Sequence, residues 1–193
     1  MFDPPVEAKA WIGWWLSSRT GLLKPNVIKT QLRHLDRVTE FSYVMQSPFR
    51  VANWAQRFVM SLYGGRGAVG AYYPLVNYVK YRVNVSVKNQ HLRVHELTHA
   101  LGWLKKQEMA VAVRFMRGKE WRRLTGRKFS LYWDNPWEIY SRVMQLRFEI
   151  MANPEGVFTS DDLAALRSAN VLARFSLSAY SDSFLLFLLN DVA

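Results

Sequence analysis

The chain contains no cysteine, and this absence removes a whole class of sites. Disulfide bonds, thiolate catalysis and cysteine-ligated metal centres are excluded, because each of them needs a thiol. A transition-metal site would therefore be built from histidine and carboxylate side chains. Only four histidines are present, so few residues are candidates for such a site.

Long hydrophobic runs are also lacking. The longest apolar stretches, residues 11–16 and 184–189, are far shorter than the roughly 20 residues that a membrane-spanning helix needs. No basic segment leading into an apolar run follows Met1, so we expect no signal peptide and, by default, a cytoplasmic location. Of the 193 residues, 50% are nevertheless hydrophobic and 15% aromatic, so the chain is expected to fold around one core.

Acidic residues are scarce relative to basic ones. The 15 Asp and Glu residues face 26 Lys and Arg residues, which gives a formal net charge of +11. Such a charge attracts nucleic acid, anionic lipid and acidic proteins without choosing among them. The basic residues cluster at 105–128. We interpret this region as a solvated basic face, with contact to nucleic acid or to an acidic protein as the alternative.

The spacing of apolar residues predicts the elements of the first half of the chain. Apolar side chains recur at helical spacing over residues 6–17, 25–46 and 48–62, and each segment is expected to form an amphipathic helix. Apolar and polar residues then alternate over residues 79–87, which is typical of a half-buried strand. Residues 70–73 are expected to supply a second strand.

Helix-start signals dominate the second half. Asn89 is expected to cap a helix that ends near residue 106, and Asn135, followed by a proline, opens a helix over residues 136–152. Further helices are expected over residues 107–124, from Thr159 onward and over residues 181–192. The pattern predicts one α+β domain over residues 1–193, predominantly helical, with N-terminal helices in 1–63, a core in 64–152 and C-terminal helices in 153–193.

The strongest functional signal is the segment 95–99, which reads His-Glu-Leu-Thr-His within an expected helix. A helix turns about 100° per residue, so His95 and His99 lie on one face and can bind the same ion. Glu96 falls beside that face, where a base is needed within reach of a metal-bound water. The opposite face of the helix is apolar and is expected to enter the core. The competing interpretation is a chance match with two ordinary core histidines.

A catalytic zinc takes three protein ligands and leaves the fourth position to water, so a third ligand is expected. His34 is distant in sequence, and His91 lies one turn before the pair and would crowd the ion at a helix end. Lys105 occupies the position where a metzincin has its third histidine, which excludes that family. An acidic ligand from a later helix remains, and we choose Glu138 because it opens the helix at 136–152.

Two other roles for this glutamate compete with metal binding. Glu138 occupies the position of a capping-box glutamate, and it could pair with Arg142 one turn later. Glu149, on the same face of that helix, and Glu120 are the alternative third ligands.

Two segments carry a resemblance to a known family. Residues 95–101, His-Glu-Leu-Thr-His-Ala-Leu, and residues 138–141, Glu-Ile-Tyr-Ser, resemble the gluzincins, zinc peptidases in which a downstream glutamate completes the histidine pair. The second segment is similar to the Glu-x-x-Ser of thermolysin-like enzymes, with Arg142 where an aspartate is usual. The likeness spans residues 70–152 and extends to compact zincin-like proteins of phages and mobile elements. It implies a zincin-like core in which a small sheet packs on the histidine helix.

Motif and resemblance together predict a zinc-dependent metallopeptidase that hydrolyses a protein or peptide substrate. The expected ligands of Zn²⁺ are His95, His99 and Glu138, and the expected general base is Glu96. For a phage protein, the host cytoplasm or the virion would be the location.

The oxyanion donor and the alternative functions rest on weaker signals. Arg142 is the chosen donor because it shares a helix face with the third ligand, and Tyr72 or Tyr73 is the alternative. One alternative function is a non-catalytic zincin scaffold that binds nucleic acid or an acidic partner through residues 105–128. Another is a structural component of a larger assembly, such as a phage particle, that docks through Trp11, Trp14, Trp15 and residues 184–189. Ordinary packing in the core is the competing interpretation of these aromatic and apolar residues.

Overall fold

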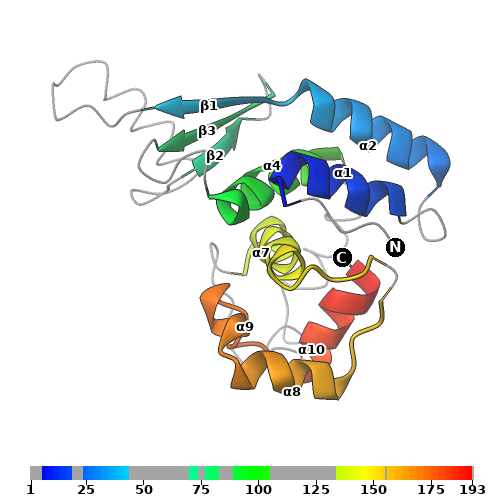
Figure 1. The fold of residues 1–193 in the computed structure, drawn as a ribbon, viewed down its shortest axis with the longest axis vertical. Helices are drawn as coiled ribbons and strands as arrows, with labels where there is room; N and C mark the ends of the chain where they lie inside the picture. The colour runs from blue at the N-terminus through cyan, green and yellow to red at the C-terminus, as the bar shows by residue number, and fades with distance from the viewer. Residues whose placement is uncertain are drawn as a thin grey trace, which may run out of the picture.

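The structure is a computed structural model, and it describes residues 6–18, 24–43, 70–73, 77–82, 89–104, 134–154 and 156–192. Over these residues the chain is an α+β protein, predominantly helical, with a three-stranded sheet, which confirms the expected fold class (Figure 1). The helices expected at 48–62 and 107–124, and the basic cluster at 105–128, lie outside the described residues. Within the described part of the chain, no helix has both the length and the apolar character that a bilayer crossing requires.

The sheet consists of β1 (Thr39–Tyr43), β2 (Gly70–Tyr73) and β3 (Tyr78–Arg82) in the order β1-β3-β2. β3 pairs in parallel with β1 and antiparallel with β2. Both expected strands are present. The one expected over residues 70–73 is β2, and the one expected over residues 79–87 is β3, which is described as far as Arg82. β2 forms one edge of this sheet and lies against helix α4 (Gln90–Leu104), which carries the two motif histidines (Figure 1).

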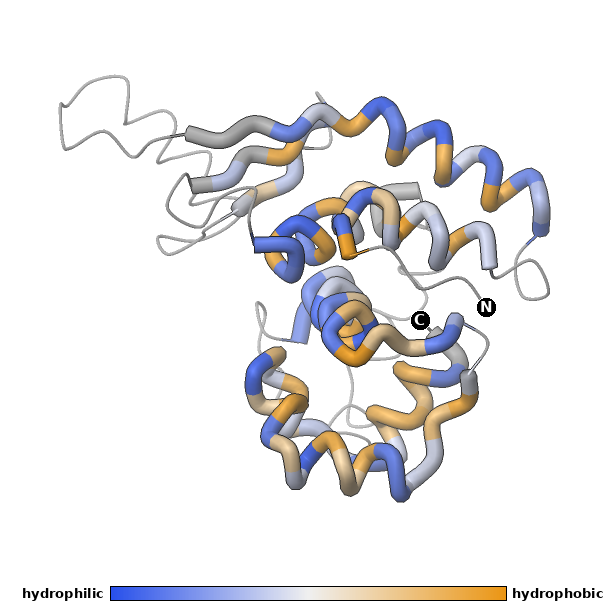
Figure 2. Tube along the Cα trace, in the orientation of Figure 1, coloured by the Kyte–Doolittle hydropathy of each residue, from blue (hydrophilic) through white to orange (hydrophobic). Residues whose placement is uncertain are grey.

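The helix expected over residues 25–46 ends early, so that prediction was wrong over residues 38–43, and residues 44–46 lie outside the described part of the chain. Helix α2 (Pro25–Arg37) begins with a proline in its first turn, and Figure 2 shows hydrophobic and hydrophilic residues alternating along it, as an amphipathic helix requires. Val38 is already extended, and β1 follows at once. β-branched and aromatic residues suit a strand, and the parallel ladder to β3 supplies the backbone hydrogen bonds that the helix would have supplied.

The hydrophobic core joins the N-terminal helix to the two helices in the middle of the fold. Helix α1 (Ala8–Ser18) confirms the helix expected over residues 6–17, and its Trp11 and Trp15 are fully buried. Their rings stack at a centroid distance of 5.4 Å, and the Trp11 ring meets the edge of Phe148 on helix α7 (Pro136–Glu149) at 5.3 Å. Figure 1 shows α7 between α4 and the C-terminal helices.

A network around Arg93 fixes α4 against the sheet. Its Nε and Nη2 atoms donate to the two carboxylate oxygens of Glu40 on β1, at 2.7 and 2.8 Å. The same guanidinium pairs with Glu7, just before α1. Two parallel hydrogen bonds from one guanidinium hold geometry better than a single one, so α4 has a defined position relative to both neighbours.

The C-terminal segment folds into α8 (Ser160–Ser168), α9 (Val171–Arg174), α10 (Asp182–Phe187) and the π-helical turn η2 (Leu188–Val192). Thr159 and Asp162 form a reciprocal capping box at the start of α8, which confirms the expected helix start. The short helix α9 was not predicted.

A buried arginine ties the ends of the chain to α7. The guanidinium carbon of Arg147 lies 4.4 Å from the Trp15 ring of α1 and 5.2 Å from the Phe158 ring that precedes α8. Its Nη2 donates to the backbone carbonyl of Leu189 in η2. Arg147 is only 2% exposed, so the aromatic rings and the carbonyl replace much of the water that a cation would otherwise bind.

Candidate metal centre

The four-residue spacing of His95 and His99 places them on one face of helix α4, and burial of the opposite face decides where that face points. Asn89 caps the helix as expected, since its Oδ1 accepts the amide hydrogen of Leu92 at 3.1 Å. Val94, Leu97 and Leu101 are buried in the core. With that face fixed inward, the imidazoles one turn apart point toward α7.

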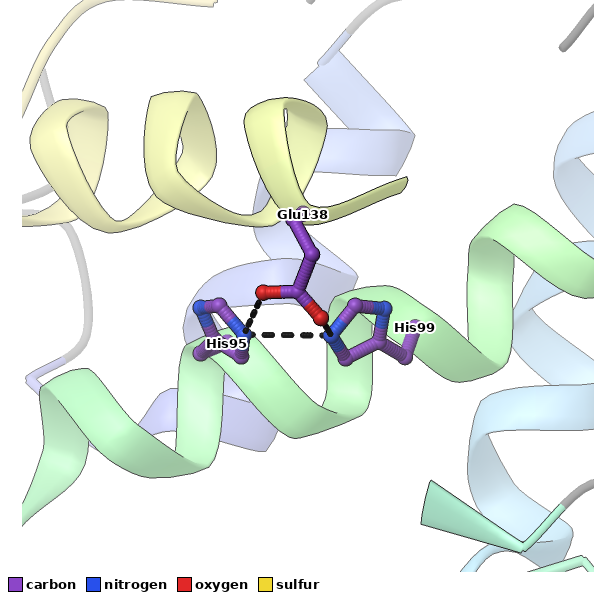
Figure 3. A group of neighbouring side chains, drawn as sticks. All are labelled: His95, His99 and Glu138. Atoms are coloured by element: carbon purple, nitrogen blue, oxygen red, sulfur yellow. Dashed lines mark hydrogen bonds and ion pairs between the residues drawn. The ribbon is translucent and has the colours of Figure 1, made fainter. Parts of the chain in front are cut away.

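Helix α7 places Glu138 in its first turn. Asn135 accepts the amide hydrogen of Trp137 at 3.1 Å, and a proline occupies the first helical position, so the expected cap is confirmed. A carboxylate at this end of a helix interacts favourably with the helix dipole. The Glu138 side chain extends toward α4, between the two imidazoles (Figure 3).

The potential ligand atoms of the three side chains converge. The Nε2 atoms of His95 and His99 are 3.1 Å apart. The Oε2 atom of Glu138 lies 3.4 Å from Nε2 of His95, and its Oε1 atom lies 3.4 Å from Nε2 of His99 (Figure 3). All three groups offer a ligand atom within 4.8 Å of the others.

These separations fit a single transition-metal ion. Zinc binds nitrogen and oxygen ligands at about 2.0–2.1 Å in a tetrahedron, which places neighbouring ligand atoms about 3.3–3.4 Å apart. The spacing of 3.1 Å between the two nitrogens is close to that value, and each carboxylate oxygen of Glu138 lies at 3.4 Å from one of them. Two imidazoles and one carboxylate also form a donor set that suits zinc chemically.

The competing glutamate is engaged elsewhere. Glu149, at the far end of α7, lies 3.0 Å from Nε2 of His91 and 2.6 Å from Nη1 of Arg174. His91 therefore meets a carboxylate of its own one turn before the candidate centre. Glu120, the other competitor, lies outside the described residues.

Glu96 is buried beside the group, under the backbone of β2. It is 5% exposed, and its carboxylate accepts the backbone N–H of Tyr72. A Cβ atom added at Gly70 would lie 2.8 Å from Oε1 of Glu96, so only a glycine lets the strand approach so closely. Burial raises the pKa of Glu96, and the attraction of His95 and His99 offsets this only in part.

Direct contacts among His95, His99 and Glu138 shift the pKa values of Glu138 and His95. Burial alone would raise the pKa of Glu138, but the hydrogen bonds from His95 and His99 outweigh burial and hold that pKa well below its usual range. Burial would lower the pKa of His95, but Glu138 and Glu96 together raise it. The group thus favours a negative carboxylate beside positive charge, the arrangement that a bound cation would also satisfy.

The residues considered as oxyanion donors lie as follows. Arg142 is buried, with Nη2 at 3.9 Å from Oε2 of Glu138, a longer contact than either histidine makes. The Tyr72 hydroxyl donates to Oδ1 of Asn77 at 3.0 Å and lies 3.3 Å from Nε2 of His34. Both tyrosines belong to β2, the strand expected over residues 70–73, and the side chain of Tyr73 is not among those that the structure describes.

A glutamine that sequence reasoning missed supports the histidine pair. Oε1 of Gln145 accepts a hydrogen bond from Nδ1 of His95 at 2.9 Å, and its Nε2 donates to the backbone carbonyl of His91 at 3.1 Å. The signal was available, because Gln145 follows Glu138 by seven residues, which places the two on one face of a helix two turns apart.

The second histidine has a weaker neighbour. Nδ1 of His99 lies 3.4 Å from the hydroxyl oxygen of Ser141, the residue between Glu138 and Gln145 along the same face. The site therefore combines three convergent ligand groups, an outer layer of polar partners and one buried carboxylate.

No family model, curated protein or solved structure matches the chain.

Proposed function

We propose that the protein is a zinc-dependent metallopeptidase with a zincin-like core, in which His95, His99 and Glu138 bind the ion. The observation that carries this proposal is the convergence of the three side chains from two helices at spacings suited to one ion. Two further features support it: the sheet edge lies on the histidine helix, and the carboxylate comes from a downstream helix.

In the proposed mechanism Glu96 transfers the proton. A zinc ion held by His95, His99 and Glu138 would act as a Lewis acid and lower the pKa of a bound water to about 7. Glu96 takes a proton from the attacking water and returns it to the leaving amine. Burial suits this role, because it raises the pKa of the carboxylate toward the working range of a base. Gly70 and the Tyr72 amide hold the carboxylate in place.

Arg142 is our candidate for stabilising the oxyanion. It is the cation that approaches the Glu138 carboxylate from the same helix, one turn later. A guanidinium aimed at developing negative charge in a water-poor site stabilises it more than it would in water.

The test combines metal analysis with cleavage of a peptide library. We expect the purified protein to hold one zinc per chain after reconstitution and to cleave peptides until a chelator removes the metal. Glu96→Gln should keep the zinc and lose cleavage by about 100-fold or more, since general bases contribute on that order. Glu149→Gln, on the far end of α7, is the matched control and should cleave normally.

The outcomes separate the parts of the proposal. Wild-type cleavage by Glu96→Gln would refute the general base. A protein that binds no zinc would refute the metal centre itself. A protein that binds zinc but cleaves no peptide would favour the alternative in which the scaffold binds a partner.

A further inference from the structure

Helices α4 and α7 face each other across a series of polar pairs. Each step of four residues forward on α4 corresponds to a step of four residues backward on α7, as an antiparallel arrangement requires. The pairs are His99 with Ser141 at 3.4 Å, His95 with Gln145 at 2.9 Å, and His91 with Glu149 at 3.0 Å. The middle pair differs from the others because its α7 residue also bonds to the backbone of α4.

The two hydrogen bonds of Gln145 define the orientation of its amide. A backbone carbonyl can only accept, so the amide NH₂ of Gln145 must face the carbonyl of His91, at 3.1 Å. The amide oxygen then faces Nδ1 of His95, at 2.9 Å. An amide oxygen can only accept, so the hydrogen in that bond belongs to Nδ1.

The orientation of Gln145 determines which ring nitrogen of His95 is available to a ligand. In a neutral imidazole with its hydrogen on Nδ1, the lone pair resides on Nε2. Nε2 of His95 is the atom that faces His99 and Glu138. Because Gln145 is bonded to the same helix that carries the histidine, the acceptor and the imidazole keep a fixed relation.

We propose that Gln145 is a positioning residue for the metal centre, which bridges the carbonyl of His91 and Nδ1 of His95, so that Nε2 of the neutral His95 ring is bare and aimed at the ion. The hydrogen bond from Nε2 to Glu138 belongs to the protonated ring, which loses that hydrogen before Nε2 can bind an ion. The inference rests on the proposed metal site, although the tautomer that it assigns is a property of the metal-free protein. The Ser141 hydroxyl lies at 3.4 Å from Nδ1 of His99, a longer distance than that between Gln145 and His95, and a hydroxyl can rotate. Among the described residues, His99 therefore has no partner held as firmly as Gln145. Outer partners of this kind typically change metal affinity by about 10- to 100-fold.

Three variants separate this role from simple packing. Gln145→Glu keeps an oxygen acceptor at the same reach, whereas Gln145→Met keeps the volume and loses the acceptor. Gln31→Met is the control for the substitution itself, because Gln31, at 2% exposure, is more buried than the half-buried Gln145 and lies on α2, a helix that carries no candidate ligand. Zinc affinity is measured by competition with a chromophoric chelator, and the folded state is checked by thermal unfolding.

A role in positioning predicts a specific order of affinities. We expect zinc affinity to fall about 10- to 100-fold in Gln145→Met and to stay within about tenfold of wild type in Gln145→Glu. Gln31→Met should bind as wild type does. A packing role predicts the opposite order, because methionine fills a half-buried position between two helices better than a charged carboxylate does. A methionine variant that binds as tightly as the glutamate variant or the wild type would overturn the proposal.

A measurement on the metal-free protein keeps the inference apart from the proposed function. Nitrogen-15 NMR of labelled histidine, followed over pH to the point where the His95 ring has become neutral, reports which nitrogen of His95 carries the hydrogen. We expect the Nδ1–H tautomer in the wild type and a mixture in Gln145→Met. The Nε2–H tautomer in the wild type would overturn the inference. A wild-type protein with the Nδ1–H tautomer that binds no zinc would refute the proposed function and leave the assignment of Gln145 to the tautomer intact.

Discussion

Two glutamates on α7 differ in what surrounds them, and this makes the third ligand testable. Glu138 lies 3.4 Å from both candidate imidazoles, whereas Glu149 is paired with His91 and Arg174. Loss of an outer partner typically lowers metal affinity by about 10- to 100-fold. We expect Glu138→Ala to lower zinc affinity by more than that, because Glu138 is a candidate ligand. Glu149→Ala should leave the affinity near wild type. Competition with a chelator measures both, and the reverse order would move the third ligand to Glu149.

Gly70 offers a second test, directed at the base and not at the metal. In Gly70→Ala the new methyl group would meet the Glu96 carboxyl at 2.8 Å, so that flexible side chain has to move. We expect the variant to fold and to bind zinc, but to lose peptide cleavage by about 100-fold or more. Gly13→Ala is the control, since its added carbon would lie 3.9 Å from Leu32, an ordinary contact. Unchanged cleavage in Gly70→Ala would show that the Glu96 position does not matter.

At this scale the sequence predicted the part of the candidate site that is local. His95 and His99 share a helix, so their spacing alone places them together. Glu138 could be chosen only because it opens a well-capped helix, and the structure brings it to the pair. Gln145 was missed because its spacing from Glu138 gives only a shared helix face, and what it contacts depends on how α4 and α7 pack.

Among the elements, α7 connects helix capping to the candidate centre. Asn135→Ala removes the hydrogen bond to the Trp137 amide and should lower the free energy of unfolding by about 1 kcal/mol. Because Glu138 lies in that first turn, we expect zinc affinity to fall as well. Denaturant titration and chelator competition measure the two effects.

The control for this element is the cap of α8. Thr159→Ala breaks a capping box on a helix that carries no candidate ligand, so it should cost a similar free energy of unfolding. Its zinc affinity should stay at the wild-type value. Equal losses of affinity in both variants would mean that general stability, and not the first turn of α7, controls binding.

Element boundaries were predictable where the signal is local. The caps at Asn89, Asn135 and Thr159 were each identified from the sequence, because a cap depends on residues within one turn. The end of α2 was not, since β1 exists through its pairing with β3, about 40 residues later. Long-range pairing leaves no trace in the spacing of apolar residues, and Val38 and Phe41 continued the helical pattern by coincidence.

For the whole molecule, the charges of the centre predict opposite pH dependence with and without metal. The pKa of His95 is raised above 6.5, so its stabilising contribution is present below pH 6.5 and is lost as pH rises through the raised value. The pKa of Glu138 is lowered below 4.5, so its contribution is present above pH 4.5 and is lost as pH falls through the lowered value. Between these limits the metal-free protein has both contributions.

Zinc should reverse the trend on the alkaline side. The ion needs unprotonated imidazoles, so its binding, and the stability that it adds, increases as pH rises. Thermal unfolding with a chelator and with excess zinc, from about pH 5 to about pH 9, measures the difference. We expect the midpoint with chelator to fall above pH 6.5 while the gap to the zinc-bound protein widens. Parallel curves over this range would contradict the assignment of His95 to the centre.

The arginine at position 147 sets a lower limit on how far the protein can be trimmed. The family resemblance covers residues 70–152, yet this guanidinium packs on Trp15 and Phe158 and bonds to the carbonyl of Leu189. A shortened chain that began at residue 70 would lose Trp15, and one that ended at residue 152 would lose Phe158 and Leu189. In either case the Arg147 guanidinium would lose part of the surroundings that replace water around it. The core of the described residues therefore extends beyond the motif-bearing stretch into both flanks.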